Sequence, residues 1–188
     1  MSREADVLLA EKRHTWEKMM LVLAGSAFAK NGIQSTYDRF RRITDVSTKA
    51  VPVYLDCGGF FGGLALSFSY IRRRHGDSRH PDRVFAVFNA SSLVGLYTKV
   101  HSVSFLADGA RILPVEEETW DGYVTRADGR FYVHETIIAS LNVADFVKIA
   151  SAGRVEGEVG PTHFTVKNKQ LELWQELAEK IVYRKLAA

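Results

Sequence analysis

The side chains that could do chemistry are dispersed carboxylates and histidines, and none stands in the spacing of a catalytic or metal-binding motif. The six histidines include no H-x-x-x-H or H-E-x-x-H arrangement. Cys57 is the single cysteine, so neither an intrachain disulfide nor a zinc site with two thiolates can form. No G-x-S-x-G sequence marks an activated serine. The motifs therefore predict no catalytic residue, no metal site and no cofactor.

Glu135 is the carboxylate that ordinary surface placement explains least well. In a strand over residues 131–138, Phe131, Val133, Glu135 and Ile137 would share one face, and the sequence does not decide whether that face is buried. If it is, Glu135 becomes a buried acid whose charged form is disfavoured by desolvation. A structural role, in which Glu135 accepts hydrogen bonds from backbone amides, is the alternative interpretation.

One enzymatic hypothesis follows from these side chains. Glu135 or Asp108 could work with a histidine from another strand, either His101 or His163, in a small hydrolase. His134 cannot pair with its neighbour Glu135, because successive side chains of a strand point to opposite faces. A pocket that holds Glu135 with His101 or His163 would favour the hydrolase. A packed interior would favour a non-catalytic module.

The net positive charge of the chain lies in residues 31–100, which hold ten Lys and Arg against five Asp and Glu, and five of those basic residues form a basic segment over residues 72–83. Its arginines are predicted to bind an anion, and they are Arg72, Arg73, Arg74, Arg79 and Arg83. The partner would be an unknown protein, a polysaccharide or another anionic surface, and an ordinary solvated loop is the alternative. The loop lacks the stacking aromatics that favour nucleic acid. Salt-sensitive binding to heparin, weakened when residues 72–74 become Ala, would support the prediction.

The first 29 residues resemble a leader. An apolar run from Met19 follows three basic residues and ends at Ala27-Phe28-Ala29, which predicts a signal peptide cleaved after Ala29 and a periplasmic or secreted product. Four acidic residues before the run favour the alternative, a retained N-terminal helix on an intracellular accessory protein. No segment is long and apolar enough to be a transmembrane helix. Determining the N-terminus of the expressed product by mass spectrometry distinguishes a cleaved signal peptide from a retained helix.

The elements that would position these side chains are mainly strands. Between Leu96 and Leu141, three Asp-Gly pairs separate β-branched and aromatic runs, and such pairs predict tight turns in an antiparallel meander. The pairs are Asp108-Gly109, Asp121-Gly122 and Asp128-Gly129. A short helix capped by Asn142, a hairpin around Gly160-Pro161 and an amphipathic helix from Asn168 are predicted to follow.

Together these patterns predict a single β-rich domain over residues 30–188. The 188-residue chain is 46% hydrophobic and 25% charged, which is typical of a globular protein with its own core. Strands followed by helices predict an α+β fold, predominantly antiparallel β. We expect a sandwich or strongly curved sheet of about eight to ten strands, with a short helix and the C-terminal helix packed on it. The function that the sequence favours is an exported, non-catalytic binding or structural module of unknown ligand.

Overall fold

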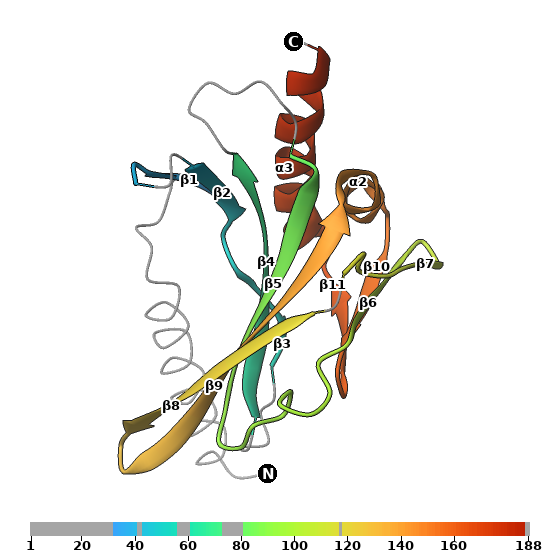
Figure 1. The fold of residues 1–188 in the computed structure, drawn as a ribbon. Helices are drawn as coiled ribbons and strands as arrows, with labels where there is room; N and C mark the ends of the chain where they lie inside the picture. The colour runs from blue at the N-terminus through green and yellow to red at the C-terminus, as the bar shows by residue number, and fades with distance from the viewer. Residues whose placement is uncertain (1–31, 41–42, 56–60, 73–80, 117, 187–188) are drawn as a thin grey trace, which may run out of the picture.

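The computed structural model describes residues 32–40, 43–55, 61–72, 81–116 and 118–186. In these residues most strands belong to one large antiparallel sheet, ordered β1-β2-β4-β5-β9-β8, with β3 also paired to β4 (Figure 1). Its strands are β1 (Ile33–Asp38), β2 (Ile43–Thr48), β3 (Val51–Tyr54), β4 (Phe61–Arg72), β5 (Arg83–Ser92), β8 (Thr119–Ala127) and β9 (Arg130–Asn142).

A second, smaller antiparallel sheet has the order β11-β10-β6-β7. Its strands are β6 (Val103–Ala107), β7 (Ala110–Ile112), β10 (Val155–Val159) and β11 (Thr162–Val166). Two helices complete the described fold, α2 (Val143–Ser151) and α3 (Asn168–Leu186). The predicted α+β fold with predominantly antiparallel sheets is therefore confirmed. No helix in the described ranges has the length and apolar character needed to cross a membrane.

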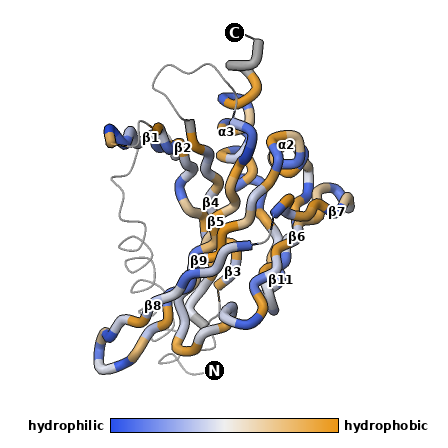
Figure 2. Tube along the Cα trace, viewed as in Figure 1, coloured by the Kyte–Doolittle hydropathy of each residue, from blue (hydrophilic) through white to orange (hydrophobic). Residues whose placement is uncertain are grey.

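The core lies between the large sheet and a second layer made by the small sheet and both helices (Figure 1). Phe68 of β4 lies at the centre of this layer boundary. Its ring centroid is 6.2 Å from that of Phe105 in the small sheet, 4.9 Å from that of Phe146 in α2 and 4.8 Å from that of Trp174 in α3. One aromatic side chain thus contacts every component of the covering layer, and hydrophobic stretches follow the central strands (Figure 2).

Local signals place the helices as the sequence predicts. Asn142 caps α2, because its side-chain oxygen accepts a hydrogen bond from the backbone amide of Asp145 at 2.8 Å. The apolar stripe of α3 is buried, and it consists of Leu171, Trp174, Leu177, Ala178 and Ile181. The hairpin around Gly160-Pro161 is formed by β10 and β11.

Two of the three Asp-Gly pairs form turns, and the prediction for the third is wrong. Both residues of Asp108-Gly109 and of Asp128-Gly129 have positive φ, as the type I′ turn requires. Gly122, in contrast, lies in the middle of β8. There the ring of Trp120 lies across it, since a Cβ on Gly122 would be 2.7 Å from Trp120 Cζ2. Gly122 therefore allows the Trp120 ring to approach the backbone closely, a role that glycine often has inside a strand.

Candidate functional site

Glu135 is buried on the inner face of β9, with 1% of its surface exposed, and its carboxylate is surrounded by donors. Glu135 Oε2 accepts from the backbone amide of Leu96 at 2.8 Å, and Oε1 accepts from the amide of Tyr97 at 2.9 Å. The indole of Trp120 at 3.2 Å and the hydroxyl of Thr98 at 3.3 Å also donate to Oε1. A carboxylate engaged by four donors acts as an anchor for the backbone at residues 96–98.

The segment anchored by Glu135 connects the two sheets. Tyr97 is buried, and its phenol is hydrogen-bonded to the hydroxyl of Thr162 in β11 at 2.8 Å. Burial raises the pKa of Tyr97 to about 12, against the opposing effect of the hydrogen bond to Thr162. At the adjacent turn, a Cβ on Gly160 would collide with the carbonyl oxygen of Val100. Glu135 and Tyr97 therefore hold the β10–β11 hairpin close to the large sheet.

The other predicted catalytic residues also have structural partners. Asp108 accepts hydrogen bonds from the backbone amides of Gly153 at 3.2 Å and Arg154 at 2.9 Å, which links the β6–β7 turn to the start of β10. His101 Nδ1 donates to the carbonyl oxygen of Tyr97 at 3.1 Å. His163 lines a groove that Glu135, Asp108 and His101 do not line. This groove therefore holds none of the predicted acid–histidine pairs.

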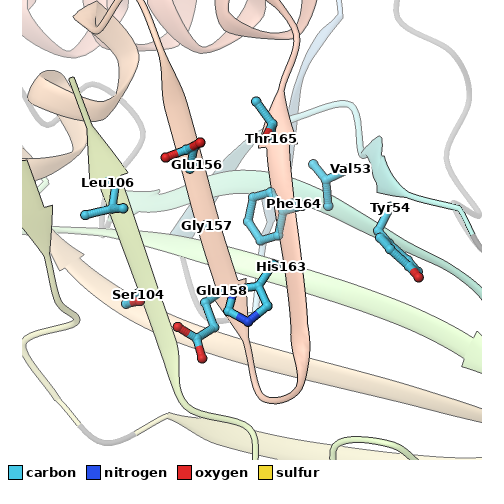
Figure 3. Close-up of a pocket in the computed structure, with 10 residues that line it drawn as sticks. All are labelled: Val53, Tyr54, Ser104, Leu106, Glu156, Gly157, Glu158, His163, Phe164 and Thr165. Atoms are coloured by element: carbon cyan, nitrogen blue, oxygen red, sulfur yellow. The ribbon is translucent and has the colours of Figure 1, made fainter. Parts of the chain in front are cut away.

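The groove lies on the outer face of the small sheet and has a volume of about 450 Å³. Side chains alternate along its strands, so that Phe105 and Phe164 enter the core while polar neighbours face outward. Across the sheet, Glu158 of β10 is opposite both Ser104 of β6 and His163 of β11. Figure 3 shows these side chains, together with Glu156, two residues before Glu158 in β10, and Tyr54 of β3 at one side of the groove.

Two acidic side chains, Glu156 and Glu158, line this groove. Glu156 Oε1 forms an ion pair with Arg154 Nη2 at 2.6 Å, and both side chains are partly exposed. Glu158 is half-buried and makes no ion pair within the described part of the chain. Its carboxylate lies among the imidazole of His163 and the hydroxyl of Ser104, which suits a ligand that carries hydrogen-bond donors or a positive charge.

Sequence reasoning did not single out Glu158. The signal was present in Glu156-Gly157-Glu158, because residues two apart in a strand share a face. Gly157 between them is required by the core, since a Cβ there would collide with the ring of Phe164. The neighbours that make the groove, however, come from β6 and β3, far away in the sequence.

The basic loop and the leader stay predictions. Arg83 Nη2 forms an ion pair with Glu116 Oε1 at 3.2 Å, so this arginine already has an acidic partner. Arg73, Arg74 and Arg79 lie outside the described residues, as do the first 29 residues, and Arg72 ends β4.

Among the described residues, no group of three or more His, Cys, Asp or Glu side chains is arranged to hold a metal ion. Comparison of the chain with protein-family models, with curated proteins and with solved structures found no match.

Proposed function

We propose that this chain is a non-catalytic binding module, and that its groove on the small sheet binds a ligand carrying positively charged amino groups. The observation that carries the proposal is Glu158, a half-buried carboxylate in the groove without an ion pair in the described residues. A carboxylate beside polar neighbours on a rigid strand can accept charge-assisted hydrogen bonds from an ammonium group.

The hydrogen bonds of the two acids that the hydrolase hypothesis names, Glu135 and Asp108, support binding rather than catalysis. Glu135 accepts four hydrogen bonds from within the fold, and Asp108 accepts two from backbone amides. General acid–base catalysis needs a group free to exchange a proton with a substrate within hydrogen-bond reach. The interior is packed with aromatic rings, which also fits a scaffold that presents its binding groups on the outside.

The experiment compares two variants that remove one carboxylate each. A penta-lysine peptide is titrated into the full chain, into Glu158→Gln and into Glu172→Gln, with binding followed by calorimetry. Glu172 is exposed on α3 and serves as the matched control for net charge. We expect Glu158→Gln to weaken binding about tenfold, which corresponds to 1.4 kcal/mol, and Glu172→Gln to leave it unchanged.

The binding should also weaken as salt is added, because an open groove is accessible to counter-ions. Equal affinities for the two variants, or no binding of the peptide to the unaltered chain, would contradict the proposal.

A further inference from the structure

β8 is the longest edge strand in the described fold. Among the residues that the structure describes, β8 has nine residues and pairs on one side only, with β9, in a continuous register. Edge strands invite pairing with another chain, and proteins usually block them with Lys, Pro, a bulge or a short length. β8 contains neither Lys nor Pro. The other edge strands are shorter: β1 has six residues, β11 has five, β3 has four including Pro52, and β7 has three.

The β8–β9 hairpin also exposes large apolar side chains. Tyr123 and Val124 of β8 are 54% and 61% exposed, and Phe131 of β9 is 61% exposed. The tip of this hairpin extends away from the second layer, at the lower left of Figure 1. Exposed apolar residues along an unpaired strand are typical of an interaction surface.

The turn determines which backbone groups of β8 face the free edge. Asp128-Gly129 is a two-residue turn closed by the pair Ala127 and Arg130. That closing pair is hydrogen-bonded, and hydrogen-bonded pairs alternate with non-hydrogen-bonded pairs along an antiparallel ladder. The backbone groups facing away from β9 are therefore those of Trp120, Gly122, Val124 and Arg126. In agreement, the amide of Gly122 does not bond to β9 but donates to the side chain of Asp121 at 2.8 Å, a local hydrogen bond that a pairing strand would replace.

These outward-facing residues complement a second copy of themselves. In an antiparallel pair centred on Tyr123, Trp120 lies opposite Arg126 of the other copy and Gly122 lies opposite Val124. This register matches every outward-facing residue with another one and aligns the whole of β8 from Thr119 to Ala127. No like charges face each other, since Asp121 is opposite Thr125 and Arg126 is opposite Trp120.

We propose that β8 pairs antiparallel with β8 of a second copy of this chain, about a two-fold axis at Tyr123, so that the two large sheets become continuous. An isologous contact of this kind is the commonest way in which soluble chains form dimers. The pairing would cover the exposed side chains of Val124 and Tyr123. The proposal is independent of the groove on the small sheet.

The first test measures the mass of the full chain in solution by sedimentation, at concentrations up to about 100 µM, where even weak association is visible. We expect a dimer for the unaltered chain and for Val182→Lys, a matched control on the exposed side of α3. Val124→Lys and Val124→Pro should be monomers, because they introduce a charge or remove an amide at the free edge. A folded monomer with the circular dichroism of the unaltered chain is expected for Val124→Lys, which retains the backbone amide.

The second test examines the register by cross-linking, in a Cys57→Ser background. Cysteines at Tyr123 would face each other as a non-hydrogen-bonded pair with Cα atoms about 4.5 Å apart, within disulfide range. Those at Thr125 would be about 14 Å apart. We expect Tyr123→Cys to form a disulfide-linked dimer on mild oxidation and Thr125→Cys to form none. Equal cross-linking of both, or an unaltered chain that is monomeric throughout, would overturn the proposal and leave this edge to a different protein or to residues 1–31.

Discussion

Glu135 illustrates how a buried charge is used for structure at the scale of a single residue. A carboxylate without partners inside a protein costs several kcal/mol, but hydrogen bonds from donors in a fixed arrangement compensate this cost. Here the donors are two backbone amides, an indole and a hydroxyl, and they come from two separate segments of the chain. The side chain therefore specifies where the segment after β5 must lie.

The substitution Glu135→Gln tests this role. The amide keeps the shape of the side chain, but it removes the charge and directs an NH₂ group towards donors. Hydrogen bonds to charged groups contribute about 1.5–3 kcal/mol each, and they are not additive, so we expect the free energy of unfolding to fall by about 2–4 kcal/mol. Urea unfolding followed by tryptophan fluorescence measures the change. The exposed control Glu172→Gln should shift it by less than about 0.5 kcal/mol, and an equal effect of both variants would refute the anchoring role.

At the scale of an element, the β8–β9 hairpin is held by a histidine on the outer face of the sheet. The ring of His134 stacks on Tyr123 with centroids 4.9 Å apart, and His134 Nε2 is hydrogen-bonded to Thr125 Oγ1 at 2.7 Å. His134 is buried, and this burial lowers its pKa below the usual 6.5. The imidazole of His134 is therefore harder to protonate in the folded protein than in the unfolded chain.

This burial predicts a loss of stability in acid. Below the ordinary histidine pKa of about 6.5 the unfolded chain takes up a proton that folded His134 takes up only at lower pH. The contribution of neutral His134 to the free energy of unfolding is thus fully present above about pH 6.5, and it is lost as the pH falls through the pKa of His134 in the folded protein. Unfolding midpoints measured from neutral to mildly acidic pH should fall more for the unaltered chain than for His134→Gln. Parallel pH profiles for the two proteins would show that His134 is not responsible.

At the scale of the whole molecule, the arrangement of the two sheets depends on the junction between Glu135, Tyr97 and Thr162. Tyr97 reaches from the segment anchored by Glu135 to the β10–β11 hairpin, whose outer face forms the groove. The same junction thus determines the position of the proposed binding surface relative to the large sheet. Disturbing it should loosen the small sheet before the large one.

Strongly alkaline pH disturbs this junction, because the phenol of Tyr97 then loses its proton. In the folded protein the pKa of Tyr97 is raised from 10.0 to about 12. The unfolded chain therefore loses the phenol proton at a lower pH than the folded protein does. The stabilisation is present below about pH 10 and is lost as the pH rises through the folded pKa. In Tyr97→Phe the unfolding midpoint should fall less steeply as the pH rises through the alkaline range. The variant should also lose about 1 kcal/mol of the free energy of unfolding, because its hydrogen bond to Thr162 is absent. A profile as steep as that of the unaltered chain would assign the alkaline loss to other groups.

The sequence by itself determined the features that depend on neighbouring residues. Alternating side chains and the turns at Asp108-Gly109 and Asp128-Gly129 identified strands, because φ preference and side-chain direction are local properties. Helix capping by Asn142 and the apolar stripe of α3 were predictable for the same reason.

Only the tertiary structure decided which face of β9 is buried, what surrounds Glu135 and which side chains share the groove. β6 and β10 are adjacent in the small sheet although about fifty residues separate them in sequence, so Ser104 and Glu158 meet through pairing that no local pattern encodes. The role of Gly122 also depends on the tertiary structure. Its sequence context predicts a turn, but the Trp120 ring lies across it and donates a hydrogen bond to Glu135. Burial and hydrogen bonding between distant segments depend on how the sheets pack, and packing is a property of the whole chain.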